Sequence, residues 1–437
     1  MGANAPDCEF SRFVRAANRA IMTRPRGRRH VAPSGLLSQP SPAHKINAPQ
    51  RPRATINLNE MPPMTDPRLE KLASVLVQYS TRVKPGDLVR VAGPPASRAM
   101  LVAIYRAAIA AGGNPFVQMT PDECAQIKLR DGSDEQLRFE NPLEQQTIET
   151  IDVSISLWGD DNTKALSGVD PARQALASQA RRKYMAAFFE RAAAGTLRWV
   201  GAQCPCHAAA QDAEMSLSDY EDFVFRATLV HLGDPVAAWR DVQARQQKLV
   251  DYLNQRSEIR FVTPQGTDLT LGVEGRTWIN CAGGENMPDG EVFTGPIEDA
   301  TNGVVAYHFP AVYHGRQVDE VRLRFEHGKV VDASAARGEE FLFAMLDQDP
   351  GGRILGEAAI GTNYSIDRHT RNTLFDEKIG GTFHCALGAA YPESGGKNTS
   401  ALHWDMVCDL RQGGQIFADG ELISEYGRFL NADWPRP

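Results

Sequence analysis

The sequence lacks the features that mark several large classes of protein. No apolar run approaches the ~20 residues that a membrane-spanning helix needs. No GxGxxG follows the first expected strand and no GxxxxGK[ST] occurs, so the dinucleotide and P-loop fingerprints are absent. Neither GxSxG nor HExxH is present, which excludes the α/β-hydrolase elbow and the helical zinc-protease motif. Any chemistry must therefore come from side chains that are dispersed along the chain.

Cysteine and net charge are also modest. Seven cysteines lie at scattered positions among 437 residues and form no disulfide framework. This usage fits a reducing compartment, and we expect a cytoplasmic protein. A net charge of -7 gives no reason to expect nucleic acid as a partner. The composition is typical of a soluble globular protein, and the length predicts two domains.

The first 63 residues differ from the rest in composition. They hold ten basic and three acidic side chains, nine prolines and no sustained apolar period. This composition predicts a disordered basic extension, residues 1–63. Three origins remain open: an organelle targeting segment, a tail that touches an anionic surface, or an upstream extension of the gene with initiation at Met64. No apolar segment typical of a secretion signal is present.

Residues 64–260 have the pattern of an α/β domain. Apolar spacing predicts helices and short apolar runs predict buried strands. The short connections between them imply right-handed parallel crossovers, and hence a parallel sheet covered by helices. The expected helices begin near residue 66, follow the strand at 87–93, and occupy 177–195 and 216–255; the expected strands are 87–93, 114–119, 152–160 and 197–203.

After residue 257 the pattern alternates with period 2 and is rich in turns, as in EIRFVTPQGTDLTLGV. Residues 261–437 are therefore predicted to form a β-rich domain of hairpins and meanders. The fold class is α/β plus α+β: an N-terminal parallel-sheet domain and a C-terminal β-rich domain.

The stretch from residue 376 to 405 is the most informative part of the chain. It places carboxylates and imidazoles, the ligands that borderline divalent metals prefer, among many glycines. His403 and Asp405 are two apart, so on a strand they point to the same side. The polar members of the stretch are Asp376, Glu377, His384, Tyr391, Glu393, His403 and Asp405.

Each of these residues also has a simpler interpretation. His384 alone is more often a buried structural histidine, and Asp376 competes with Glu377 for any role. Glu291 and Glu357 lie in glycine-flanked turns, where a lone glutamate is usually a solvated loop residue. Together they form a stronger signal, because several carboxylates can converge in one domain only if a cation compensates them.

Other candidates are weaker. CPCH at residues 204–207 suggests soft-metal chemistry, but no second cysteine cluster completes a four-ligand site. Four other histidines have no partner at a suitable spacing and are interpreted as surface or structural residues: His308, His314, His327 and His369.

The motifs ENMPDGEVFTGP, GEAAIGTN, LFDEKIGGTFHCALGAAYPESGGKN and SALHWDM resemble the aminopeptidase T family, over most of residues 66–434. The resemblance implies a dimer with an N-terminal α/β domain and a β-rich metal domain. It implies that Glu357 lies between two metal ions and that Tyr391 belongs to the active centre. The implied metal ligands are Glu291, Glu357, Glu377, His384, His403 and Asp405, with Asp376 still open as the alternative to Glu377.

This resemblance implies a metal-dependent aminopeptidase that acts on short peptides. Six oxygen and nitrogen ligands suit two Zn²⁺ or Co²⁺ ions, or Mn²⁺ or Mg²⁺ in their place. Glu357 is then a candidate for proton transfer, and the hydroxyl of Tyr391 for stabilising the oxyanion.

Two alternatives remain. A mononuclear Fe(II) ring-opening dioxygenase of the same superfamily would need only two histidines and one carboxylate. His384, His403 and Asp405 would supply that set. The other alternative is a metal-stabilised binding protein that has lost its catalytic ability.

Overall fold

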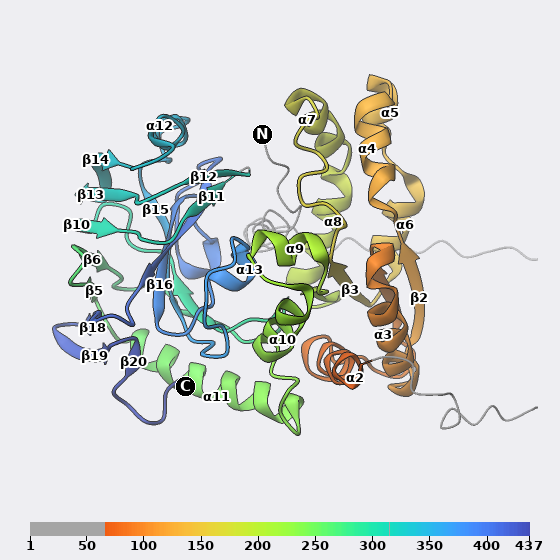
Figure 1. The fold of residues 1–437 in the computed structure, drawn as a ribbon, viewed down its shortest axis with the longest axis horizontal. Helices are drawn as coiled ribbons and strands as arrows, with labels where there is room; N and C mark the ends of the chain where they lie inside the picture. The colour runs from red at the N-terminus through yellow and green to blue at the C-terminus, as the bar shows by residue number, and fades with distance from the viewer. Residues whose placement is uncertain (1–65, 314) are drawn as a thin grey trace, which may run out of the picture.

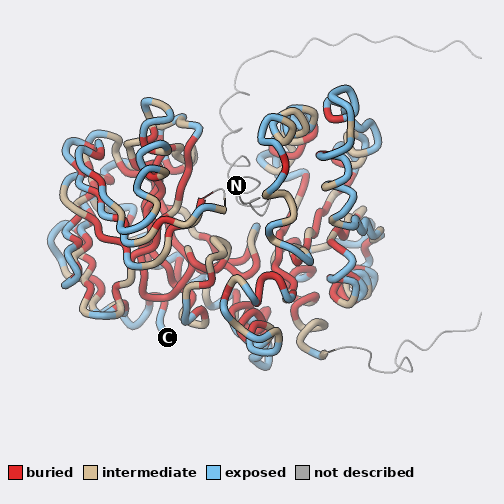
Figure 2. The backbone as a smooth tube through the Cα atoms, turned by 45° about the horizontal axis from the view of Figure 1, so that its top comes forward, coloured by how far each residue is buried: buried red, intermediate tan, exposed pale blue. Residues whose placement is uncertain are grey.

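The computed structural model describes residues 66–313 and 315–437. The predicted basic extension, residues 1–63, lies outside the described residues. Figure 1 shows a helix-rich α/β region beside a β-rich region, with the long helix α11 running along the latter. Buried backbone runs through the interior of both regions (Figure 2).

The α/β region is built on a five-stranded sheet in the order β2-β1-β3-β4-β8. All four strand pairings are parallel, which confirms the expected sheet. Because the strands are parallel, they are joined by helical crossovers. Its strands are β1 (Leu88–Gly93), β2 (Asn114–Met119), β3 (Val153–Trp158), β4 (Arg198–Gln203) and β8 (Asn286–Met287).

Helices surround this sheet, and their N-termini follow local capping chemistry. The side chain of Asp66 accepts a hydrogen bond from the Arg68 amide, with proline at the first helical position. Asp234 and Pro235 begin α11 in the same way. The helices are α2 (Pro67–Ser74), the π-helix η3 (Val75–Ser80), the 3-10 helix η4 (Pro95–Ser97), α3 (Arg98–Ala110), α4 (Asp122–Asp131), α5 (Asp134–Leu137), α6 (Pro142–Thr150), α7 (Pro171–Ala180), α8 (Arg182–Ala193), α9 (His207–Asp212), α10 (Leu217–Ala227) and α11 (Pro235–Leu253).

Two expected helices are each divided in the structure. The helix predicted at 177–195 is α7 and α8, which meet at Arg181. The helix predicted at 216–255 is α10 and α11, separated by a turn in which Leu229 has a φ of 62°. A helical period carries no signal for such a break when the flanking residues are themselves good helix formers.

The β-rich region contains two main sheets, both antiparallel as expected. An eight-stranded sheet has the order β14-β13-β10-β6-β5-β18-β19-β20 and a five-stranded sheet has the order β17-β16-β15-β9-β7. The strands of the first are β5 (Glu258–Val262), β6 (Asp268–Gly272), β10 (Thr301–Ala306), β13 (Arg322–Glu326), β14 (Lys329–Ser334), β18 (Gln415–Ala418), β19 (Glu421–Glu425) and β20 (Arg428–Phe429). Those of the second are β7 (Ile279–Cys281), β9 (Glu291–Thr294), β15 (Leu355–Gly361), β16 (Thr382–Gly388) and β17 (His403–Asp409).

A small hairpin and three short helices complete this region. They are β11 (Ala311–Tyr313), β12 (Arg316–Val318), α12 (Glu339–Leu346), α13 (Thr373–Asp376) and the 3-10 helix η5 (Pro392–Ser394). The predicted division near residue 260 stays a prediction. The short strand β8 follows residue 260 in the sequence but pairs with β4 in the parallel sheet of the α/β region.

The two faces of the five-stranded sheet have different environments. One face packs on the eight-stranded sheet, and the rings of Phe261 and Phe383 stack there with centroids 4.0 Å apart. Because side chains alternate along a strand, the neighbours of these core residues point to the opposite face. That face carries the polar residues that the sequence singles out.

The helix α13 connects this region to the α/β region. Its Phe375 is fully buried and packs against both Tyr220 and Phe223 of α10, with ring centroids 6.3 and 5.1 Å away. Arg371, just before α13, pairs with Glu214 at 2.8 Å. The segment that leads to Glu377 is thus held by both regions.

Candidate metal centre

Four adjacent strands of the five-stranded sheet carry the polar cluster on one face. Glu291 begins β9, Glu357 lies in β15, His384 lies in β16, and His403 and Asp405 begin β17. The register aligns them, because Gly361 of β15 lies opposite Glu291 while Ala386 of β16 lies opposite both Glu357 and Asp405. Residues with small or no side chains occupy the positions between them on this face: Ala359, Gly361, Ala386 and Gly388.

The polar side chains converge into two triads that share Glu357. Nε2 of His384 lies 3.5 Å from Oε2 of Glu291 and 3.4 Å from Oε1 of Glu357. Nε2 of His403 lies 3.6 Å from Oε2 of Glu357 and 3.4 Å from Oδ1 of Asp405. Each triad brings one nitrogen and two oxygens within 4.8 Å of one another, a spacing that a metal ion could bridge. The two oxygens of Glu357 therefore face different triads.

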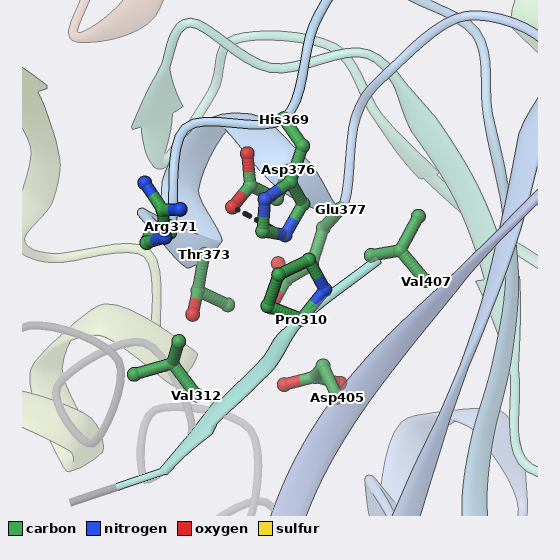
Figure 3. A pocket seen from close by; sticks show the side chains of 9 residues that line it. All are labelled: Pro310, Val312, His369, Arg371, Thr373, Asp376, Glu377, Asp405 and Val407. Atoms are coloured by element: carbon green, nitrogen blue, oxygen red, sulfur yellow. Dashed lines mark ion pairs between the residues drawn. The ribbon is translucent and has the colours of Figure 1, made fainter. Parts of the chain in front are cut away.

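Glu377 lies beside these triads rather than within them. Its Oε2 is 3.0 Å from Nζ of Lys378, and its side chain lines a pocket together with Asp405. Figure 3 shows this pocket, which is also lined by Val312 of β11 and by Pro310, just before that strand. Of the residues of the two triads, Asp405 alone lines this pocket.

Asp376, the alternative to Glu377, is committed to the surrounding loop. Its Oδ1 accepts hydrogen bonds from the backbone nitrogen and the hydroxyl of Thr370, at 2.6 and 3.0 Å. Its Oδ2 lies 3.1 Å from Nε2 of His369 (Figure 3). With both oxygens engaged, Asp376 is poorly placed to bind an ion, and neither triad includes Asp376 or Glu377.

His369 was expected to be either a surface or a structural residue, and the structure shows it mostly buried. Its ring stacks on Phe309 with centroids 5.0 Å apart, and the side chain is only 12 % exposed. It lines the pocket as a structural partner of Asp376. His308 and His327 are exposed, as expected of surface residues. No signal in the sequence distinguishes His369 from these two.

Lys378 is a member of the site that sequence analysis misses. The side chain is 1 % exposed, and Nζ lies 3.3 Å from Oε1 of Glu291 and 3.0 Å from Oε2 of Glu377. A buried lysine needs such partners, because an unpaired buried charge is costly. The available signal was its position next to Glu377 in a glycine-rich segment.

Tyr391 packs at the other end of the cluster. Its ring meets the ring of His403 edge-on with centroids 5.2 Å apart, and it contacts Phe293 at 5.3 Å. Tyr391 is the residue that caps η5. Glu393, within η5, belongs to none of the three metal-like groupings among residues 66–313 and 315–437.

Three buried polar atoms of the two triads have no hydrogen-bond partner within the described part of the chain: Oε2 of Glu291 and both ring nitrogens of His384. Oε2 of Glu291 and Nε2 of His384 face each other across 3.5 Å. Buried polar atoms are normally satisfied, and such exceptions need an explanation. An ion held between a carboxylate oxygen and an imidazole nitrogen would supply it, so these residues fit a divalent cation.

The pKa values show how much negative charge is concentrated here. Burial raises the pKa of Glu377 well above its usual range, and nearby Asp405 adds to the effect while Lys378 opposes it. For His384, burial would lower the pKa, but the contact with Glu357 and the charge of Glu291 outweigh it and raise the pKa to about 9. Several buried carboxylates with little positive charge near them repel one another, and a bound dication would reduce this repulsion.

CPCH has a structural role in this fold. Cys204 and Cys206 are buried among apolar side chains, and burial raises the pKa of the Cys204 thiol to about 12. A thiol that resists deprotonation is a poor metal ligand. Within the described ranges, none of the metal-like groupings includes either cysteine.

Among the helices of residues 66–313 and 315–437, none combines the length and the apolar character that a membrane span requires.

Comparison with known proteins finds relatives of this chain. Residues 65–429 match the model of the family described as thermophilic metalloprotease (M29). Aminopeptidase 2 of Geobacillus stearothermophilus is 30% identical over 378 residues, which cover 78% of this chain and 91% of that protein. Aminopeptidase T of Thermus thermophilus is 38% identical over 186 residues, 39% of this chain and 45% of its own.

Two solved structures share the fold. AmpT from Thermus thermophilus has a TM-score of 0.71 at 27% identity and covers 84% of this chain and 99% of its own. A 2,5-dihydroxypyridine dioxygenase from Pseudomonas putida KT2440 has a TM-score of 0.53 at 14% identity, covering 85% and 99%. The second likeness concerns the fold alone.

Proposed function

Since the chain belongs to the thermophilic metalloprotease family (M29) and is a metallo-aminopeptidase, we propose that it removes N-terminal residues from short peptides at a centre of two divalent ions. The observation that carries the proposal is the sharing of Glu357 between two triads. The first triad adds Glu291 and His384 to Glu357, and the second triad adds His403 and Asp405 to it. We propose these five residues as ligands and Zn²⁺ or Co²⁺ as the ions, with Mn²⁺ or Mg²⁺ as substitutes.

Two such ions, when bound, would supply Lewis acidity toward the scissile carbonyl and a water whose pKa is lowered to near 7. The protein's part is to place the groups that act on that chemistry. Glu357 directs one oxygen to each histidine, which supports a role as the shared ligand and leaves the proton transfer to another residue in this proposal.

Glu377 is the better placed residue for proton transfer. The resemblance to the family implies that it is a sixth ligand, yet neither triad includes it. Oε2 is held by Lys378, so Oε1 would take the proton of the attacking water and pass it to the leaving amine. Its place on the pocket lining beside Asp405 supports this role.

Tyr391 is proposed to stabilise the oxyanion. Its ring packs against the ring of His403, which places the tyrosine beside the second triad. A phenolic hydroxyl that donates to the developing oxyanion contributes roughly 2.7–4 kcal/mol in comparable sites. We further propose a homodimer, on the basis of the family resemblance, and a cytoplasmic location, on the basis of the cysteine usage.

The function is tested by metal analysis together with an aminoacyl-anilide assay. Purified protein should hold near two Zn or Co ions per chain and lose hydrolysis when a chelator strips them. Either ion should restore the activity. One Fe per chain with ring-opening activity would instead support the dioxygenase alternative, and bound metal without turnover would support a binding protein.

A further inference from the structure

The two triads differ in their surroundings. We propose that the ion held by Glu357, His403 and Asp405 binds more tightly than the ion held by Glu291, Glu357 and His384. The inference rests on the proposed function and concerns how metal supply regulates that same site. Two independent observations support it, one at the histidines and one at Lys378.

The two imidazoles are not equally prepared to bind. Nδ1 of His403 lies 2.8 Å from the carbonyl oxygen of Ala389, which fixes the proton on Nδ1 and leaves Nε2 as the ligand atom. Nδ1 of His384 has no hydrogen-bond partner among the described residues, although the side chain is fully buried. Such outer partners orient a ligating histidine and raise its basicity, and their loss typically costs about 10- to 100-fold in metal affinity.

Lys378 adds an electrostatic difference. Its ammonium group contacts Oε1 of Glu291 at 3.3 Å, while Oε2 of the same carboxylate faces His384. A fixed positive charge on a ligand repels a dication, and at 1 % exposure of the lysine side chain solvent screens this repulsion little. Within the described residues, the second ion pair of Lys378 is with Glu377, and no ion pair joins it to a member of the second triad.

Lys378 is thus a positioning residue as well as a charge. It holds one oxygen of Glu291, so that carboxylate can offer the first triad only its other oxygen. A chain with one ion would keep it in the second triad and lack the first. Hydrolysis would then depend on the concentration of free metal, which makes the weaker position the regulated one.

The order of affinity is measured by titrating the chelator-stripped full chain with Zn²⁺ alone against a competing chromophoric chelator. We expect two binding steps whose constants differ by about tenfold or more. Glu291→Gln should remove the weaker step and keep the tighter one, and Asp405→Asn should do the reverse. Two ions of equal affinity, or loss of the tighter step in Glu291→Gln, would overturn the inference alone. A single ion per wild-type chain would overturn the two-ion function itself.

The contribution of Lys378 is tested in the same titration. Lys378→Gln should tighten the weaker step by about tenfold or more and leave the other step unchanged. Lys378→Arg should retain the wild-type constants, and removal of an exposed lysine in Lys329→Gln serves as the matched control. Unchanged constants in a folded Lys378→Gln protein would refute the electrostatic argument. The Glu291→Gln and Asp405→Asn titrations decide the order of affinity even if Lys378→Gln does not fold.

Discussion

Asp376 and Glu377 are adjacent in the sequence, but their carboxylates have different partners. Asp376 is bonded by Thr370 and His369 within its own loop. Glu377 contacts Lys378 and lines the pocket beside the metal-like triads. Asp376 therefore holds its own loop together, whereas Glu377 lies at the candidate site. The sequence alone does not decide which of the two has which role.

Glu377→Gln is expected to lower kcat by about 10²- to 10⁴-fold, because the amide cannot carry a proton. The bound metal should stay at the wild-type level, since neither triad includes Glu377. Steady-state hydrolysis of an aminoacyl-anilide and elemental analysis measure the two quantities. Full activity in this variant would rule out Glu377 as the proton carrier.

Asp376→Asn should instead act on stability. The change removes charge from an acceptor that is buried and holds Thr370 and His369, so we expect a loss of about 1–3 kcal/mol in the free energy of unfolding. Chemical unfolding followed by tryptophan fluorescence gives this value. A large fall in kcat at unchanged stability would contradict the division between the two residues.

Glu357→Gln is expected to weaken both metal positions at once, because its two oxygens face different histidines. Loss of a shared ligand should reduce hydrolysis by more than about 100-fold, beyond what outer-sphere changes cause. Metal content and activity should fall together. Glu393→Gln is the control, since Glu393 lies outside both triads; equal losses in the two variants would point to a general effect of charge.

Tyr391→Phe should lower kcat by about 10²- to 10³-fold with little change in KM or in bound metal, as for loss of an oxyanion donor. Its ring packing against His403 and Phe293 is kept by phenylalanine. Tyr364→Phe provides a matched control, because that hydroxyl donates to Gly427 instead. An unchanged kcat would remove Tyr391 from the chemistry.

Phe375→Ala tests whether the α/β region supports the site. The ring is fully buried against Tyr220 and Phe223, so its loss should cost about 3–5 kcal/mol in the free energy of unfolding. Phe139, which is 61% exposed, should tolerate the same change within about 0.5 kcal/mol. Thermal unfolding distinguishes the two variants, and equal shifts would mean that α13 is not anchored by α10.

The geometry of the two triads was accessible from sequence to an unusual degree, for a specific reason. Spacing by two residues puts His403 and Asp405 on one side of a strand whatever the rest of the fold does. The structure brings these two together, and it also brings Glu291 and Glu357 to them from other strands. The register between strands determines that these four side chains come together. Local sequence patterns do not give this register, and the expectation that the four residues share one site came from the family resemblance.

The burial of Lys378 and the role of Asp376 could not be predicted from the sequence. A lysine looks the same in sequence whether it is exposed or buried, and Lys378 has its meaning only from Glu291, which lies 87 positions earlier. The break at Arg181 and the pairing of β8 with β4 are likewise set by tertiary packing, which overrides local propensity.

The alternation of β16 between core and polar face constrains the length of the strand as strictly as its composition. Phe383 and Cys385 point into the apolar core, and His384 between them points to the triads. Insertion or deletion of one residue here would send an imidazole into the core and a phenyl ring into the metal centre. Related chains can therefore vary in the loops around this sheet, whereas an odd change in strand length would have to be absorbed by a bulge.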